Sequence, residues 1–208
     1  MIEMVENAKN HPPHFTNAAF DIVTIAASAG GLTAIVKVLS TLKAEFPAAI
    51  AIVQHLAPQH HSFMAEILSR RTDIIVKQAQ EGDSLTSGTA YVAPPNRHLL
   101  VNGDGTLSLS QSELVHFLRP SADLLFESVA ATYKDRAIAL VLTGTGSDGA
   151  MGVKAIKKMG GTVIVQDVKT AEFSGMPSAA IQTGNVDFIL PLNEISSTLV
   201  TLVMGECD

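Results

Sequence analysis

Segments of two kinds follow one another along this sequence: short apolar runs, and longer segments in which apolar residues recur at helical spacing. Runs of strand length, dominated by apolar side chains, cover residues 21–28, 49–54, 74–76, 137–142, 162–166 and 186–190. Segments with apolar side chains at helical spacing cover residues 32–42, 62–71, 121–133, 149–159, 177–182 and 194–204. Because strands and helices follow one another in turn, we expect an α/β fold with a doubly wound, mostly parallel sheet.

The section from residue 88 to residue 110 breaks this alternation. Short strands are expected there at residues 89–93, 98–101 and 106–109. Asn102-Gly103-Asp104-Gly105 separates the last two, and such glycine pairs between strands are typical of tight hairpin turns. The sequence therefore predicts an antiparallel hairpin appended to the parallel sheet.

One domain accounts for most of the chain. We expect a flexible N-terminal tail over residues 1–20, which carries acids but no apolar run, and a single domain over residues 21–208. The N-terminus does not resemble a signal peptide, and no window approaches the roughly 18 apolar residues of a membrane span. We therefore expect a cytoplasmic protein without direct membrane insertion.

Charge and cysteine content narrow the classes of partner. The net charge of −6 disfavours a nucleic-acid role, which requires a basic surface. Cys207 is the only cysteine, so an intrachain disulfide is excluded and a reducing compartment is favoured. The histidine pairs His60-His61 and His11…His14 lack spaced carboxylate or cysteine companions, so we expect no metal and no cofactor.

Three polar side chains follow apolar runs along the chain. Ser28, His55 and Asp148 lie at or just beyond the carboxyl ends of expected strands, which meet at one edge of a parallel sheet. A serine hydroxyl becomes nucleophilic when a base takes its proton and a carboxylate orients that base. The helix after Ser28 would also direct backbone N–H groups at a developing oxyanion. The three residues therefore fit acyl transfer.

Structural roles explain the same residues when each is taken alone. A serine between a strand and a helix commonly caps the helix, as does an aspartate before one. A histidine at a strand end is more often a satisfied residue at the rim of the core. The placement of Ser28, His55 and Asp148 therefore leaves a catalytic and a structural interpretation open.

A glycine-rich loop offers a rival function from a different class. Residues 144–149 match the G-x-G-x-x-G dinucleotide fingerprint, and Asp167 ends the next expected strand, where a ribose-binding acid would lie. Against this, Asp148 would bring a carboxylate into a pyrophosphate cradle, and only about 60 residues follow the loop. The glycines Gly144, Gly146 and Gly149 fit better as space around Asp148, with a dinucleotide-binding or non-catalytic module as the alternative.

Six short motifs occur in order between about Asp21 and Leu192. They are Ile25-Ala-Ala-Ser28-Ala-Gly-Gly31, Val53-Gln54-His55-Leu56, Tyr91-Val-Ala-Pro94 with His98, Arg119-Pro-Ser-Ala-Asp-Leu-Leu-Phe126, Leu142-Thr-Gly-Thr-Gly-Ser-Asp-Gly-Ala150-Met-Gly152 and Gly175-Met-Pro177. Each is weak alone, but together they resemble the catalytic domain of bacterial chemotaxis protein-glutamate methylesterases, the CheB type.

This resemblance implies an activity and the residues that perform it. The family hydrolyses γ-glutamyl methyl esters on the cytoplasmic helical bundles of chemoreceptors, and many members also deamidate receptor glutamines. By motif, Ser28 is the implied nucleophile, His55 the base and Asp148 the acid that orients the base. The backbone N–H groups of Ala29 and Thr145 are the implied oxyanion donors.

The sequence departs from the family pattern at several points. Ala26 stands where a glycine is usual, and its methyl group is expected to crowd the turn before Ser28. Ala29 replaces a frequent threonine and Thr145 a frequent methionine, but both are implied to act through their backbone. No receiver domain precedes residue 21, so we expect a constitutive enzyme or control by a separate regulatory protein.

Three further side chains are candidates for the substrate rim. Arg97, His98 and Arg119 could form a local basic rim near the glutamates of a receptor, although solvated charges explain them equally well. The leading hypothesis is therefore a receptor-directed methylesterase. A serine esterase or amidase of the same fold with another substrate is the second hypothesis.

Overall fold

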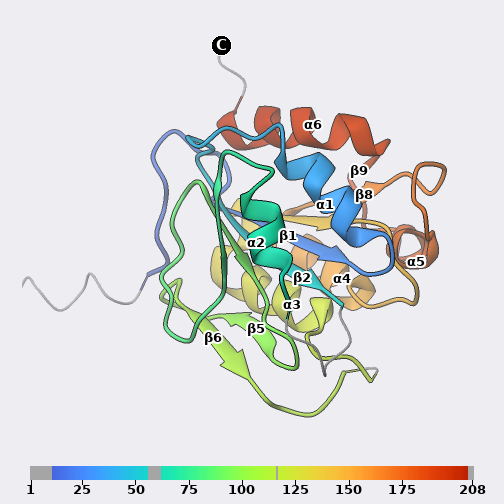
Figure 1. The fold of residues 1–208 in the computed structure, drawn as a ribbon, viewed down its shortest axis with the longest axis horizontal. Helices are drawn as coiled ribbons and strands as arrows, with labels where there is room; N and C mark the ends of the chain where they lie inside the picture. Colours follow the sequence, from blue (N-terminus) through green and yellow to red (C-terminus); the bar gives the residue numbers. More distant parts are fainter. Residues whose placement is uncertain (1–10, 56–61, 116, 206–208) are drawn as a thin grey trace, which may run out of the picture.

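A parallel sheet of seven strands forms the centre of the computed structural model, which describes residues 11–55, 62–115 and 117–205 (Figure 1). The strands are β1 (Ile22–Ala27), β2 (Ala49–Gln54), β3 (Ile75–Gln78), β4 (Thr89–Val92), β7 (Ala137–Val141), β8 (Thr162–Gln166) and β9 (Phe188–Leu190). Their order is β3-β4-β2-β1-β7-β8-β9, and every neighbouring pair is parallel. The predicted doubly wound sheet is confirmed.

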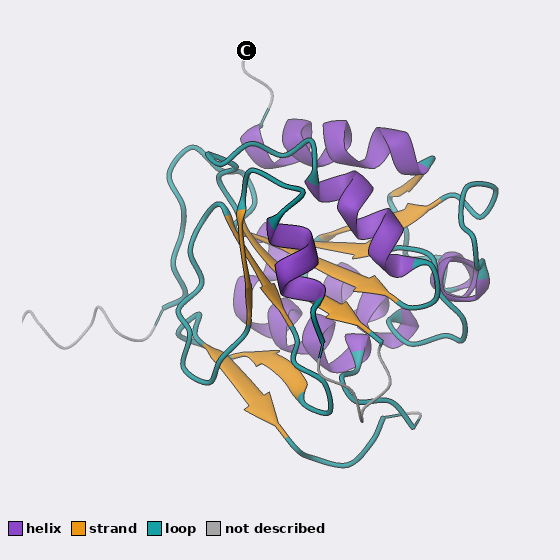
Figure 2. Ribbon diagram, in the orientation of Figure 1, coloured by secondary structure: helices purple, strands orange, loops and turns teal. Residues whose placement is uncertain are grey.

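Helices cover both faces of the sheet, as Figure 2 shows. One layer contains α1 (Gly31–Leu39), α2 (Met64–Ser69) and α6 (Leu192–Met204), and the other contains α3 (Ala122–Tyr133), α4 (Ala150–Lys158) and α5 (Gly175–Gln182). A short 3₁₀ turn, η1 (Lys134–Arg136), follows α3. None of the helices in the described ranges has the length and apolar character that crossing a membrane requires.

The central strands are buried on both faces, which explains their continuous apolar runs. In β1, Ile22 and Ala26 belong to the core beneath α3 and α4, while Val23, Ile25 and Ala27 belong to the core beneath α1 and α6. This alternation follows from the period of two in a strand. The sheet therefore separates two hydrophobic cores, and its carboxyl edge remains available for polar side chains.

The strand order reverses between β1 and β7. The chain places β2, β4 and β3 on one side of β1, and β7, β8 and β9 on the other. In doubly wound folds the loops part at such a switch point and leave a crevice outside the carboxyl ends of the strands. The carboxyl ends of β1, β2 and β7 therefore define where a site should form.

The expected hairpin is present beside α3. Strands β5 (His98–Val101) and β6 (Leu107–Ser110) pair antiparallel, and the turn between them contains Gly105 at a φ of 79°. The hairpin packs on α3, where the Val101 N–H donates to Ser128 Oγ. The remaining strand of this section, β4, lies in the main sheet between β2 and β3.

The segment before β1 is tied to the domain rather than free. The Phe15 N–H donates to the buried Asp21 carboxylate, and the Ala19 N–H donates to the Val203 carbonyl of α6. Arg136 binds the same carboxylate and the Ala18 carbonyl. Within the segment expected to be a flexible tail, the backbone groups of Phe15, Ala18 and Ala19 therefore have hydrogen-bond partners in the fold. Residues 1–10 lie outside the described ranges.

The close packing of α3 on α4 generates a stability prediction. A Cβ atom at Gly152 would lie 2.5 Å from Phe126 Cβ. Alanine is normally the better helix former. Here the contacted atom is fixed to the backbone of α3, so the two helices must move apart, and we expect Gly152→Ala to lower the free energy of unfolding by about 1–3 kcal/mol. Urea denaturation measures this change. Gly103→Ala, at a position with nothing within 4 Å, is the matched control and should be nearly neutral. An unchanged midpoint for Gly152→Ala would contradict the tight contact.

Candidate active site

Three adjacent strands bring the expected catalytic side chains to one edge of the sheet. Ser28 directly follows β1 and His55 directly follows β2, and the His55 N–H donates to the Ala27 carbonyl at 3.0 Å. Asp148 lies in the loop between β7 and α4. Because β1 pairs with both β2 and β7, residues far apart in the sequence share the switch point.

The turn that carries Ser28 is fixed by backbone bonds and by two glycines. The Ser28 N–H donates to the Thr143 carbonyl at 3.0 Å, and its own carbonyl accepts the Gly31 N–H at 2.9 Å. Gly30 adopts a φ of 75°, a conformation that residues with a Cβ rarely take. A Cβ at Gly31 would lie 2.7 Å from Ala27 Cβ, which is fixed to the backbone of β1. The turn therefore requires glycine at both positions, for different reasons.

Ala26 does not crowd this turn. Strand β1 keeps regular parallel register through Ala26, which pairs with Val53 on one side and Val141 on the other. Its methyl group is fully buried in the core beneath α3 and α4. The expected crowding is therefore wrong, because the side chain points into the core and not into the turn.

Gln54 and Thr143 hold the turn from two sides, and sequence analysis assigned neither a role. The Gln54 amide donates to the carbonyls of Ser28 at 2.7 Å and of His55 at 3.0 Å, which joins the two strand ends. The Thr143 hydroxyl donates to the Ala29 carbonyl at 3.0 Å. The available signal was a buried glutamine at the end of an apolar strand, because a buried polar side chain needs partners.

His55 and Asp148 form a direct contact. His55 Nε2 lies 2.7 Å from Asp148 Oδ2, and the side chains are 9% and 1% exposed. With Asp148 ionised, Nε2 is the protonated nitrogen of neutral His55 and Nδ1 is the nitrogen that can accept a proton. In the described ranges the Ser28 hydroxyl makes no hydrogen bond. Its relation to His55 therefore rests on their neighbouring strand ends.

The Asp148 carboxylate is held by four donors. Besides His55 at Oδ2, it accepts the Ser121 hydroxyl at 2.9 Å, the Ala122 N–H at 2.6 Å and the Asp123 N–H at 3.1 Å. Burial raises the pKa of Asp148, but the hydrogen bonds from His55 and from the N-terminus of α3 lower it by more. The group is therefore ionised at neutral pH and able to stabilise a positive charge on His55.

Backbone donors lie beside Ser28. Gly144 packs against the serine so closely that a Cβ there would lie 2.8 Å from Ser28 Cβ. Its neighbour Thr145 and the residue after the serine, Ala29, each carry an N–H that has no partner within residues 11–55, 62–115 and 117–205. N–H groups without a partner, one directly after the serine and one after the glycine that packs against it, are the kind of donors that an oxyanion site requires.

The glycine loop is not arranged as a dinucleotide cradle. The N–H groups of Gly149 and Gly152, at the start of α4, donate to Asp123 Oδ1 at 2.9 and 2.8 Å. A carboxylate therefore occupies the position at the helix N-terminus that a pyrophosphate would take. Asp148 adds a second negative charge to the same turn. The electrostatic objection raised by the sequence is thus reinforced by the structure.

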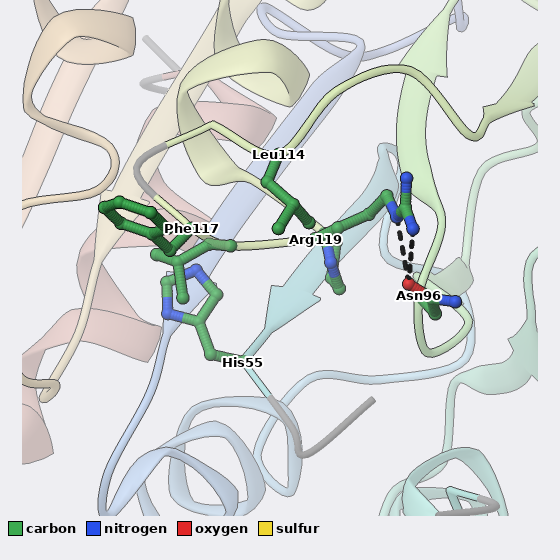
Figure 3. A pocket seen from close by; sticks show the side chains of 7 residues that line it. His55, Asn96, Leu114, Phe117 and Arg119 are labelled. Atoms are coloured by element: carbon green, nitrogen blue, oxygen red, sulfur yellow. Dashed lines mark hydrogen bonds between the residues drawn. The ribbon is translucent and has the colours of Figure 1, made fainter. Parts of the chain in front are cut away.

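A cavity of about 230 Å³ opens beside His55 (Figure 3). Leu114 and Phe117, which are 51% and 93% exposed, belong to its lining. Arg119 also lines it, but Figure 3 shows the guanidinium directed toward Asn96 and away from His55. Other Arg119 bonds reach the carbonyls of residues 111 and 112. Arg119 therefore supports the loop that carries the apolar rim.

The other two rim candidates do not face this cavity. Arg97 is exposed but lines a separate hollow near β3 and β6. His98 is fully buried, where Nδ1 accepts the Ser121 N–H and Nε2 donates to the Glu113 carbonyl. Assigning His98 to a basic rim is wrong, because the ring is a buried, neutral connector between the hairpin and the start of α3.

The histidine pairs give no metal site within the described residues. His14 Nδ1 lies 2.6 Å from the Asp21 carboxylate, at the base of the domain. No group of three or more potential ligands occurs among the side chains that the structure describes. His60 and His61 lie outside the described ranges.

The environment of His98 predicts its titration. Burial lowers its pKa, and this exceeds the opposing effect of the Glu113 carbonyl. We expect the Nε2–H tautomer at pH 7, with titration below about 6.5. Since the folded pKa lies below the unfolded one, the stability contributed by His98 is complete above pH ~6.5 and falls as the pH drops toward the folded pKa. Long-range ¹H–¹⁵N NMR reports tautomer and titration. A pKa above 6.5 or an Nδ1–H tautomer would refute this assignment.

Comparisons with known proteins agree with this geometry. The chain matches the family model described as CheB methylesterase over residues 23–199. The crystal structure of the Thermotoga maritima CheB methylesterase catalytic domain superposes with a TM-score of 0.86 at 35% identity, covering 89% of this chain and 100% of that one.

Similar sequences come from bacteria and archaea. A putative protein-glutamate methylesterase/protein-glutamine glutaminase of Leptospira interrogans is 43% identical over 88% of this chain and 95% of that protein. Proteins named protein-glutamate methylesterase/protein-glutamine glutaminase from Rhizobium meliloti (of its group 3 operon) and Pyrococcus horikoshii are 38% and 40% identical, over 97% and 87% of this chain. This chain spans 56% and 50% of their lengths. The chain belongs to the CheB methylesterase family.

Proposed function

We propose that this protein is a serine hydrolase that removes methyl groups from γ-glutamyl methyl esters on the cytoplasmic domains of chemoreceptors. The observation that carries the proposal is the buried contact of 2.7 Å between His55 Nε2 and Asp148 Oδ2, at the strand end beside Ser28. Ser28 is the nucleophile, His55 the general base and Asp148 the acid that orients the base. The names of the relatives support this choice of substrate.

In the first half-reaction Ser28 Oγ attacks the ester carbonyl carbon. The hydroxyl proton passes to His55 Nδ1, and Asp148 stabilises the imidazolium that results. The negative charge that develops on the carbonyl oxygen is accepted by the N–H groups of Ala29 and Thr145. The C–O bond to the methoxy group then breaks, and methanol leaves with the proton from His55.

In the second half-reaction water replaces methanol. His55 takes a proton from the water as its oxygen attacks the acyl carbon, and the Ser28 oxygen leaves with the proton that His55 returns. The product is a free glutamate side chain. The same sequence hydrolyses a glutamine amide with release of ammonia, which accords with the second activity in the relatives' names.

The surroundings of the site suit a protein substrate. The exposed side chains of Leu114 and Phe117 flank the cavity beside His55 and offer apolar contact to a helix that presents the ester. Cytoplasmic location follows from the same proposal, because the chemoreceptor segments that the family modifies are cytoplasmic.

Removing the nucleophile is the primary test. We expect Ser28→Ala to abolish labelling by a fluorophosphonate probe and to reduce kcat for methyl ester hydrolysis on the order of 10⁶-fold. Methanol release from methylated receptor fragments measures turnover, and circular dichroism confirms the fold. Ser197→Ala, at an exposed serine of α6, is the matched control and should label normally. Full activity in folded Ser28→Ala would reject the triad.

Changing the orienting acid should alter both rate and pH dependence. In Asp148→Asn an amide N–H faces His55 and favours the wrong tautomer, so we expect a kcat loss on the order of 10⁴-fold. The base must be neutral, so kcat/KM falls at acid pH in both proteins. Without the carboxylate charge the imidazolium is less stable, and this acid limb should move to lower pH. Superimposable pH–rate profiles with similar rates would instead make Asp148 a helix cap only.

A further inference from the structure

A second buried carboxylate lies next to the site and takes no part in the proposed chemistry. Asp123, in the first turn of α3, is 4% exposed. Its Oδ1 accepts the N–H groups of Gly149 and Gly152, two of the donors that the start of α4 cannot satisfy within its own helix. Asp123 is therefore the N-terminal cap of α4, contributed by a different helix.

Asp148 performs the reciprocal role for α3. It directly precedes Gly149, and its carboxylate accepts the N–H groups of Ala122 and Asp123 at the start of α3. Each of two neighbouring helices thus supplies the carboxylate that caps the other. Positive helix N-termini favour both negative groups, which offsets part of the repulsion between the two carboxylates.

This reciprocal arrangement controls the direction of the Asp148 side chain. Gly149 adopts a φ of 97°, so the backbone turns sharply right after Asp148. The bond from the Gly149 N–H to Asp123 fixes that turn at the residue that follows the proposed acid. If the bond is lost, the peptide plane between Asp148 and Gly149 loses one of its constraints, and the carboxylate can shift relative to His55.

Capping of α4 requires an acceptor oxygen on Asp123 but does not require its negative charge. Burial raises the pKa of its carboxyl group, the Gly152 N–H opposes the rise, and the charge of Asp148 adds to it. Both bonds to α4 reach a single oxygen, Oδ1, which an asparagine also has. The geometry of the acceptor, and not its charge, is therefore the property that α4 uses.

We propose that Asp123 is a positioning residue for the triad: by capping α4 it fixes the turn that holds the Asp148 carboxylate against His55. The proposal rests on the proposed function, since it assigns Asp123 an effect on catalysis through Asp148. Among the residues that the structure describes, the titratable side chains beside Asp123 and Asp148 are His55, which contacts Asp148, and His98, which accepts the Ser121 N–H.

The test compares three substitutions of Asp123. Asp123→Ala removes the acceptor, and we expect kcat with a small ester to fall about 10–100-fold with little change in KM. The acid limb of the pH–rate profile of this variant should move to lower pH, because a displaced Asp148 carboxylate stabilises the His55 imidazolium less. Asp123→Asn keeps Oδ1 and should stay within about threefold of wild type. Asp123→Glu keeps the charge but displaces the acceptor by a methylene group, so it should be impaired.

Two controls separate positioning from loss of stability. Asp187→Ala removes another carboxylate that accepts a backbone N–H, from Val163 at the amino end of β8, so it should lower stability without changing kcat or the pH profile. In the Asp148→Asn background, Asp123→Ala should add little further loss if it acts through Asp148. Additive losses would overturn the proposal.

A structural readout keeps the proposal testable without turnover. The His55 ring proton shared with Asp148 should give a downfield NMR signal in wild type and Asp123→Asn and lose it in Asp123→Ala. If Asp123→Ala does not fold, the other two variants decide. An active Asp123→Asn and an impaired Asp123→Glu support the proposal, whereas an impaired Asp123→Asn and an active Asp123→Glu overturn it. If the fluorophosphonate probe does not label the wild type, the proposed function is rejected. If Asp123→Ala keeps the kcat of the wild type while Asp148→Asn is inactive, only the inference about Asp123 is rejected.

Discussion

The burial of one negative charge, on Asp148, is the constraint on which the rest of the site depends. An ionised carboxylate away from water is costly unless donors replace its hydration. Here a hydroxyl, two N–H groups of α3 and the His55 ring supply four hydrogen bonds. Because three of these donors belong to the start of α3, the site exists only when that helix is docked on the sheet.

The same requirement links segments far apart in the sequence. Ser121 receives its position from His98 in the hairpin, and Asp148 from the end of β7. Gln54 joins the strand ends of β1 and β2. The hairpin and the switch point are therefore parts of one hydrogen-bonded frame around His55. A doubly wound sheet makes such a frame possible, because loops from both halves of the sheet meet at the carboxyl ends of the central strands.

Sequence reasoning could predict which strand ends lie together, although the catalytic roles of their side chains stay a prediction. Ser28 and His55 could be predicted because each ends an apolar strand, and parallel strands end at one edge. His98 could not be placed, since a histidine beside an arginine in a loop-rich section looks solvated. Only the fold shows that its ring nitrogens have backbone partners. The role of Asp123 was equally hidden, because a second-position acid in a helix normally serves its own helix dipole.

Whether Asp148 is a helix cap or a catalytic acid is not a choice between exclusive roles. A carboxylate offers about four lone-pair directions. In this structure Oδ1 serves Ser121 and Asp123, while Oδ2 serves Ala122 and His55. The cap bonds occupy the lone pairs of Asp148 that face α3, and one lone pair remains directed toward His55. Since rotation of the carboxylate would break the cap bonds, the helix holds the direction of the remaining lone pair. The hydrogen bonds by which Asp148 caps α3 therefore also fix the orientation of its carboxylate toward His55, which the proposed catalytic role requires.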